Sequence, residues 1–223
     1  MEHQIRFSPS YAMVEVELSK GEKFVTEAGA MAWMEGPIDV TTSTRGGLLT
    51  GLKRRVFSGE SFFQNTYTAT GDGARIGVAP GVAGDVIEYP MQDGELVLQR
   101  GAYLASDPGV ICDSKWEGFR GLFNEGLFVL RATGTGVMFF SAYGDVEEIE
   151  VDGDYLVDNG YAVAWEPTLN YKLHRARRIR SFLFGDQLML RFSGKGRLWI
   201  QSRSPHGLAN FAHPFRRVER NNN

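Results

Sequence analysis

Three clusters of basic side chains are the strongest candidates for chemistry in this sequence. Each cluster stands shortly before a phenylalanine and a predicted strand, in the same part of three similar stretches of chain. Their members are Lys53, Arg54 and Arg55, then Lys115 and Arg120, then Arg175, Arg177, Arg178 and Arg180. Basic groups gathered on one face attract RNA phosphates, anionic lipid headgroups or an acidic partner. The alternative is that they pair with carboxylates of neighbouring repeats or subunits.

Other residue types that support catalysis occur without the spacing that catalysis needs. His206 and His213 flank no clear third metal ligand. Ser61 lacks the second glycine of a nucleophile elbow. Cys112 follows two apolar residues, which favours a buried and inert thiol. We therefore predict no catalytic residue, no metal site, no cofactor and no enzymatic activity.

Three further stretches indicate structure instead of a ligand. Residues 71–77 resemble a dinucleotide fingerprint but contain one residue too many and lie between predicted strands. Acidic residues within 147–154 alternate with apolar ones, as on the solvated face of a strand, and are too few for a calcium loop. The Gly- and Leu-rich residues 46–52 suit a buried connection or a subunit contact better than a membrane-touching loop.

Composition places the chain among folded proteins of near-neutral charge. It has 223 residues, of which 43% are hydrophobic, and a net charge of −3, so bulk charge does not favour a polyanion. A single cysteine excludes an internal disulfide and fits a reducing compartment. Neither a signal pattern nor a run of about 20 apolar residues is present, so we expect a cytoplasmic location.

Alternation of apolar and polar residues predicts strands along most of the chain. Val14, Val16 and Leu18 alternate with glutamates, and residues 62–69, 127–130, 137–140, 188–190 and 198–200 also suit strands. Glycine pairs such as Gly134 and Gly136 predict turns between them. Short helices are expected only at residues 46–57 and 116–123. An all-β sandwich, barrel or β-helix follows.

An internal repeat organises these strands. A glycine, an apolar strand, a second glycine and an apolar tail recur from Gly21, Gly94 and Gly153. Downstream of each, a Gly-x-Gly element recurs at Gly71, Gly134 and Gly194. Two elements that recur in the same order predict a single domain, residues 1–223, with a polar tail at 216–223. The domain is expected to contain three β-repeats, at about 10–80, 81–145 and 146–215, that share a core about a pseudo-three-fold axis.

Four motifs carry a resemblance to a known family. They are Gly46–Arg54, Ser58–Phe63, Gln99–Ala105 and Val157–Trp165. The chain resembles the family named for altered inheritance of mitochondria, number twenty-four, whose bacterial and archaeal members are of unknown function. The resemblance covers nearly the whole chain. It implies a fold similar to the tryptophan RNA-binding attenuation protein, of the double-stranded β-helix class, and possible self-assembly.

These observations favour a non-enzymatic protein that assembles with copies of itself and acts as a binding module or scaffold. A trimer is the favoured size, because three-fold pseudo-symmetry suits cyclic association. The alternative is a binder of nucleic acid or another anionic ligand, such as a phospholipid headgroup, through the basic clusters.

Overall fold

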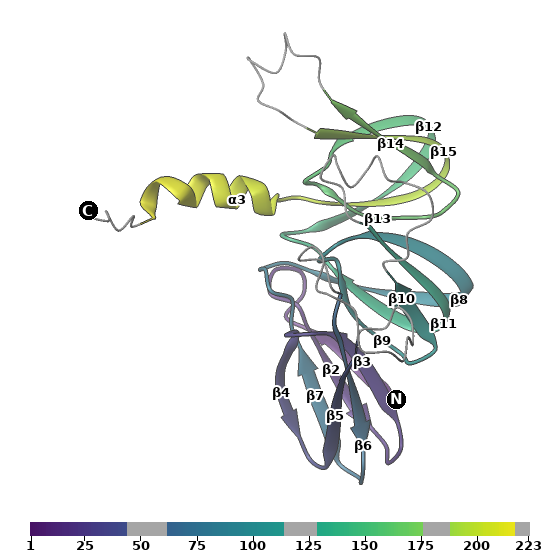
Figure 1. Ribbon diagram of the computed structural model, residues 1–223, viewed down its shortest axis with the longest axis vertical. Helices are drawn as coiled ribbons and strands as arrows, with labels where there is room; N and C mark the ends of the chain where they lie inside the picture. Colours follow the sequence, from purple (N-terminus) through teal and green to yellow (C-terminus); the bar gives the residue numbers. More distant parts are fainter. Residues whose placement is uncertain (44–61, 114–128, 176–187, 217–223) are drawn as a thin grey trace, which may run out of the picture.

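The computed structural model describes residues 1–43, 62–113, 129–175 and 188–216. The described part is almost entirely antiparallel β-structure, as predicted. Its strands fall into three groups that follow one another along the long axis of the molecule (Figure 1). A helix, α3 (Pro205–Ala212), and a 3₁₀ turn, η1 (His213–Phe215), follow the last strand.

The first strand group holds seven strands. They are β1 (Glu2–Arg6), β2 (Met13–Leu18), β3 (Lys23–Glu27), β4 (Met31–Glu35), β5 (Ile38–Ser43), β6 (Gln64–Ala69) and β7 (Ala74–Val78). Strand β2 has the alternation expected of it, because Val14, Val16 and Leu18 are buried and face the core. Strand β7 lies between β2 and β4 and pairs with both. Strand β6 lies between β3 and β5 and pairs with both.

The second and third strand groups hold four strands each. The second has β8 (Val86–Gln99), β9 (Tyr103–Ser106), β10 (Val110–Asp113) and β11 (Val129–Ser141). The third has β12 (Val146–Asp158), β13 (Ala162–Trp165), β14 (Asn170–Arg175) and β15 (Leu188–Gln201). In each group the first strand, the second and the third all pair with the last.

The turns expected within the later groups are instead strand interiors, so that prediction was wrong. Strands β8, β11, β12 and β15 run without interruption through their glycines. Gly94 lies opposite Gly134, and Gly153 lies opposite Gly194. The φ angles of Gly134, Gly153 and Gly194 are 114°, 111° and 118°, which side chains disfavour. Facing glycines therefore let two long paired strands bend together. Of the predicted Gly-x-Gly turns, the one at Gly71–Gly73 in the first group does separate two strands, β6 and β7.

The groups are joined through the edges of their strands. Strand β9 of the second group pairs with β3 of the first, and β13 of the third pairs with β8 of the second. Aromatic rings pack across both junctions. Phe139 meets Phe24 with ring centres 6.2 Å apart, and Trp199 meets Tyr89 at 5.5 Å. In place of one core shared by three repeats, the buried side chains form three clusters, each built mainly from one group and completed by its neighbours.

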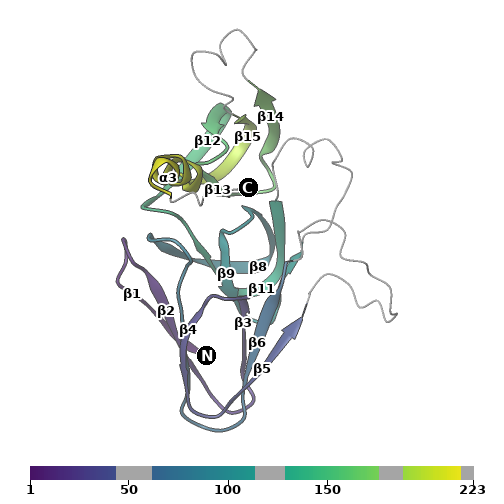
Figure 2. The same ribbon diagram turned by 60° about the vertical axis from the view of Figure 1, so that its left-hand side comes forward.

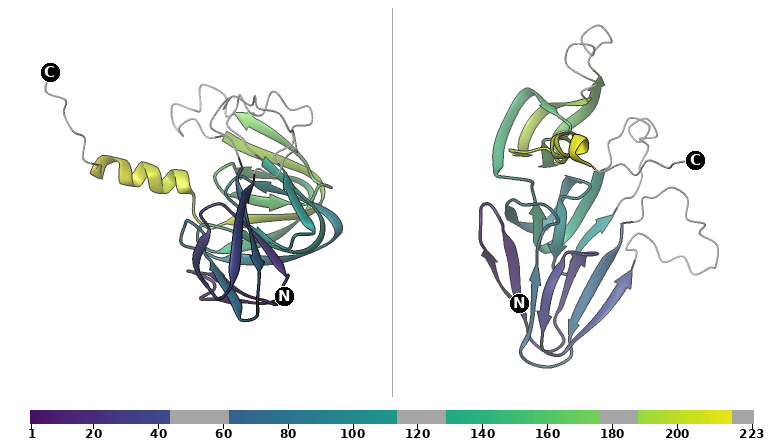
Figure 3. Two further views of the ribbon diagram at one scale, coloured as in Figure 1. Left: turned by 60° about the horizontal axis from the view of Figure 1, so that its bottom comes forward. Right: turned by 90° about the vertical axis from the view of Figure 1, so that its left-hand side faces the viewer.

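The turns that follow each group lie against one another on one side of the molecule. Gly84 bridges to Gly144 in a parallel pair, and the Gly144 carbonyl accepts a hydrogen bond from the Asp85 amide at 3.0 Å. Further along, the Arg203 amide donates to the Tyr143 carbonyl at 3.2 Å. Helix α3 leaves the body from this side and projects outward (Figures 1 and 3).

The close approach at Gly84 leads to a prediction about stability. A β-carbon there would lie 2.0 Å from the Ala142 carbonyl oxygen, and backbone cannot easily move away. We expect Gly84→Ala to lower the free energy of unfolding by about 2–3 kcal/mol, since overpacking costs this much. The melting temperature should fall by about 5–10 °C in a scanning calorimeter.

The control for this substitution is Gly81→Ala in the same turn. No atom lies within 4 Å of a β-carbon at Gly81. Its melting temperature should stay within about 2 °C of wild type. Equal effects of the two substitutions would contradict the close packing of the turns.

Candidate functional site: a polar pocket at the base of the C-terminal helix

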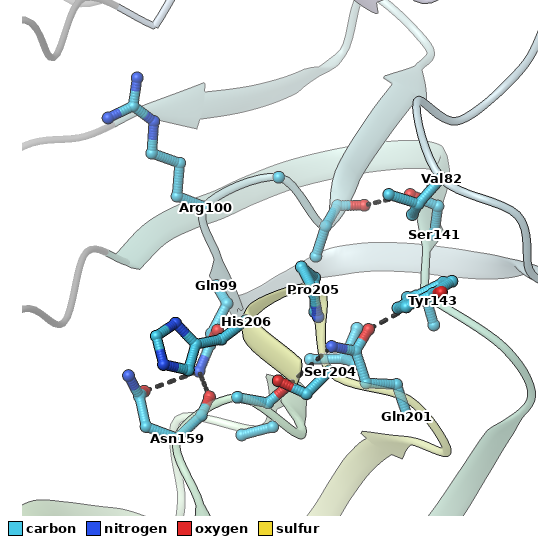
Figure 4. A pocket seen from close by; sticks show the side chains of 16 residues that line it. Val82, Gln99, Arg100, Ser141, Tyr143, Asn159, Gln201, Ser204, Pro205 and His206 are labelled. Atoms are coloured by element: carbon cyan, nitrogen blue, oxygen red, sulfur yellow. Dashed lines mark hydrogen bonds between the residues drawn. The ribbon is translucent and has the colours of Figure 1, made fainter. Parts of the chain in front are cut away.

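A polar pocket of about 350 Å³ lies between the second and third strand groups, where α3 begins (Figure 4). Five segments line it: the β7–β8 connection at Val82, the β8–β9 turn, the end of β11 with the residues after it, the β12–β13 turn, and the connection from β15 to α3. Their labelled side chains include Gln99, Ser141, Asn159, Gln201 and His206. The pocket is therefore assembled from turns that are distant in sequence and meet at the junction of two groups.

Two glutamine side chains tie these turns together. The Gln99 amide nitrogen donates to the Asn159 backbone carbonyl at 2.6 Å and to its side-chain oxygen at 3.0 Å. The Gln201 amide nitrogen donates to the Gly160 carbonyl at 2.8 Å, while its oxygen accepts from the Tyr143 amide at 2.8 Å. Hydrogen bonds within the protein thus use several of the donors and acceptors nearest the pocket.

The hydroxyl group of Ser204 has a structural role at the edge of the pocket. It accepts a hydrogen bond from the Gly207 amide at 3.3 Å and so caps the first turn of α3. Pro205 follows at the first helical position, where its missing N–H costs nothing. In the described part of the chain no hydrogen bond joins His206 to Ser204 or Ser141. The arrangement fixes the start of the helix and pairs no nucleophile with a base.

An electrostatic interaction acts across the junction between the first and second groups. The Glu27 carboxyl group is largely buried, and burial raises its pKa. The positive charge of Arg100 opposes part of that rise. Polar side chains of neighbouring strand groups therefore interact at both junctions, Glu27 with the charge of Arg100 and Gln99 with Asn159 through a hydrogen bond.

Arg197 of the third group forms ion pairs within its own group and contacts Tyr89 of the second group. Its guanidinium binds the Glu166 carboxylate at 2.8 Å and lies 5.1 Å from the Trp199 ring and 5.7 Å from the Tyr89 ring. The hydrogen bond to Glu166 raises the pKa of Arg197. Two carboxylates, Glu166 and Glu148, hold this cation within the third group, and its position over the Tyr89 ring is the contact that reaches the second group.

Most of the basic residues predicted to bind anions lie outside the described residues. These are Lys53, Arg54, Arg55, Lys115, Arg120, Arg177, Arg178 and Arg180. Arg175 ends β14, where its backbone lies opposite Leu188 of β15. The structure therefore brings none of the nine into a described site, and their common face stays a prediction. The expected short helices at 46–57 and 116–123 also lie outside the described ranges.

The remaining candidates occupy structural positions. Cys112 is buried in β10, as predicted, and burial raises the pKa of its thiol. Glu147, Glu148 and Glu150 are exposed on β12, as expected of a solvated face. Over the described ranges, no three His, Cys, Asp or Glu side chains come together as a metal site would require. The described part also contains no helix that is long and apolar enough to cross a bilayer.

The C-terminal helix and the polar pocket were missed by sequence reasoning. The sequence predicts short helices only at residues 46–57 and 116–123, and none at residues 205–215. The signal was present, because a serine before a proline is a typical start of a helix. The pocket left no comparable signal, since its glutamines and asparagine meet only through the junction of two strand groups.

Comparison with known proteins confirms the predicted family. A family model described as "Mitochondrial biogenesis AIM24" matches residues 3–203. The chain belongs to this family. A relative in Streptococcus pyogenes serotype M6, "Uncharacterized protein M6_Spy0233", is 28% identical over 217 residues, which covers 91% of this chain and 87% of the relative. The crystal structure of protein SPYM3_0169 from Streptococcus pyogenes is 25% identical with a TM-score of 0.78, covering 96% of this chain and 99% of that chain.

The raised pKa of Glu27 predicts how stability depends on pH. The folded state holds this proton more tightly than the unfolded chain, so stability falls as pH rises through the window above the unfolded pKa of about 4.3. Glu27→Gln removes the buried charge. We expect it to raise the melting temperature at pH 7, with the gain disappearing below about pH 4.

Glu22→Gln provides a control of opposite sign. The terminal amino group of Met1 donates to the Glu22 carboxylate at 2.8 Å, and this bond lowers the Glu22 pKa. Removing that charge should lower the melting temperature at pH 7 and have little effect in acid. If both substitutions shift the melting temperature in the same direction at pH 7, the burial of Glu27 is not the controlling factor.

Proposed function

We propose that the protein is a non-enzymatic binding or scaffold protein that assembles with copies of itself. One observation carries this proposal. Large apolar side chains remain exposed at both ends of the row of strand groups and on the projecting helix, with Met34, Leu156 and Phe211 exposed by 47%, 52% and 70%. Apolar surface of this kind at strand edges and on an isolated helix marks sites of protein contact.

The fold is proposed to consist of three repeats of one β-unit, in a double-stranded β-helix arrangement like that of the tryptophan RNA-binding attenuation protein. The recurring order of strand pairs in the three groups supports this proposal. A body built by adding one unit to the next through strand edges is suited to addition of further units from other copies. A cyclic trimer is the proposed assembly.

The assembly is tested by native mass spectrometry and light scattering of the wild-type protein. We expect a trimer at micromolar concentration, and native mass spectrometry of protein from its host would also report any bound molecule. A species with the mass of a single chain over the whole micromolar range would contradict the proposal.

A second proposed function is binding of an anionic ligand, RNA or phospholipid headgroups, through the basic clusters. The observation in its favour is the recurrence of the flanking strands. The three clusters occur in the connections from β5 to β6, from β10 to β11 and from β14 to β15, and each of these pairs is antiparallel. Equivalent connections in three repeats would carry their charges to equivalent places.

Salt dependence tests the anion-binding proposal. Contact with about four phosphates should weaken binding roughly 100-fold between 50 and 200 mM salt, because counterions are released on binding. We expect Arg54→Gln, Arg55→Gln, Arg177→Gln and Arg178→Gln together to abolish binding to RNA or anionic vesicles, with circular dichroism unchanged.

A charge-matched control removes four basic groups elsewhere, at Arg6, Lys20, Arg191 and Lys195, which lie on or beside described strands. This control should keep most of the binding. Salt-insensitive binding, or no binding by the wild type, would exclude the anion-binding function. Dissociation or misfolding of the first variant would show instead that its arginines serve subunit or repeat contacts.

A further inference from the structure

The two junctions inside the chain follow one rule of spacing. At the first, Val25 and Thr26 of β3 lie opposite Ser106 and Ala105 of β9. At the second, Val97 and Leu98 of β8 lie opposite Trp165 and Ala164 of β13. Both are antiparallel ladders of two residue pairs. In each case the strand that ends just before a group's β-turn glycine, β3 or the C-terminal part of β8, pairs with the four-residue strand of the next group, β9 or β13.

The rule can be stated from the glycine of each repeat, at Gly29, Gly101 and Gly160. The third residue before the glycine of one group pairs with the fourth residue after the glycine of the next group. The fourth residue before the first glycine pairs with the fifth residue after the second. Applied once more, from the third group back to the first, the rule pairs Val157 with Trp33 and Leu156 with Met34. These residues lie in β12 and β4.

Burial shows that this third pairing is unfilled within one chain. All eight residues at the two internal junctions are 0–2% exposed. Strands β9 and β13 are buried throughout, whereas the corresponding strand β4 is exposed at four of its five residues. Met34 is 47% exposed and Leu156 is 52% exposed. Two apolar side chains that the rule would bury thus face solvent.

The backbone gives the same result. Strand β4 is the last strand of the four-stranded sheet and pairs with β7 alone, and β12 is the first strand of the larger sheet and pairs with β15 alone, among the described strands. They belong to the first and third groups, which occupy opposite ends of the molecule (Figures 1 and 2). One chain in this arrangement does not bring its own two edges together.

We propose that β4 of one copy adds to the edge of β12 of a second copy, with Met34 opposite Leu156 and Trp33 opposite Val157. This inference rests on the proposed self-assembly and specifies the contact. A second copy is the expected partner because its β12 edge carries Leu156 and Val157, the residues that the spacing rule of the internal junctions pairs with β4. The contact joins different surfaces of two identical chains, so it closes into a ring, as the proposed trimer requires, or continues as a filament. Main-chain hydrogen bonds and apolar burial would both stabilise it.

Charged substitutions on either edge test this contact. We expect Met34→Lys and Leu156→Lys each to convert the assembly to single chains, because a lysine on a strand edge opposes pairing. The control is Ile111→Lys in β10, since Ile111 is 54% exposed and lies on neither edge. It should leave the trimer intact. Circular dichroism of all three variants would verify the fold.

Mixing the two edge variants gives the sharper result. The Met34→Lys protein retains a native β12 edge, and the Leu156→Lys protein retains a native β4 edge. An equimolar mixture should therefore form a dimer of one copy of each, twice the mass of either variant alone. A mixture that stays as single chains, when the wild type is a trimer, would overturn the head-to-tail contact.

Disulfide trapping reports the register. Residues opposite each other on antiparallel strands have Cα atoms about 4.5–5.5 Å apart, within the range that a disulfide spans. Met34→Cys and Leu156→Cys proteins, prepared separately and then mixed under oxidising conditions, should form a mixed dimer that a reducing agent dissociates. Cys112 is fully buried and should not compete.

The outcomes separate this inference from the function on which it rests. A wild-type trimer that Met34→Lys and Leu156→Lys leave intact overturns the edge contact and leaves self-assembly standing. A wild-type single chain overturns both. A third protein carries both Met34→Cys and Leu156→Cys in one chain. An intrachain disulfide in it at high dilution would show that one chain closes on itself, and would overturn the contact between copies.

Discussion

The pairing of strand edges between neighbouring groups is the constraint on which the rest of the structure depends. Only two residue pairs join β9 to β3, and two join β13 to β8. These short ladders set the position of each group on the next, and the side chains beside them complete the core. Leu104, Ala105 and Phe139 of the second group belong to the first group's cluster, and Ala164 and Trp199 of the third belong to the second group's cluster. A group without its neighbour would expose part of its own core.

The facing glycines make this arrangement possible within long strands. A strand of 13 or 14 residues that stayed straight would leave the body, but paired glycines at Gly94 with Gly134 and Gly153 with Gly194 let both strands bend at one place. One half of each long strand then packs in the core of its own group, and the other half contacts the adjacent group. The first group achieves the same course with a turn at Ser19–Glu22 and another at Gly71–Gly73, so that two short strands replace each long one.

Sequence patterns predicted local structure well and long-range placement poorly. The alternation at Val14, Val16 and Leu18 identified β2 because burial on one face leaves a period of two. The same reasoning assigned Gly134 and Gly194 to turns, because a glycine that bends a strand and a glycine that reverses the chain look alike in sequence. The polar pocket could not be predicted, since Gln99 meets Asn159 only after β13 has paired with β8. The sequence shows that the basic residues form three clusters at similar positions in the repeats. That the clusters share one face of the molecule is a prediction, and it depends on how each strand group is placed on the next.

The polar pairs beside the junctions explain why the edges select one partner. Backbone hydrogen bonds between strands are the same for any sequence, so a two-residue ladder alone would allow slippage by a residue pair. At the second junction the Gln99 side chain of the second group also binds Asn159 of the third, and Arg197 of the third group lies over the Tyr89 ring of the second. These contacts are directional and would be lost in a shifted register, leaving buried polar groups unsatisfied. Apolar burial therefore supplies most of the attraction at such an edge, while the side-chain amides and the cation–aromatic contact favour the register in which one β-group pairs with the next.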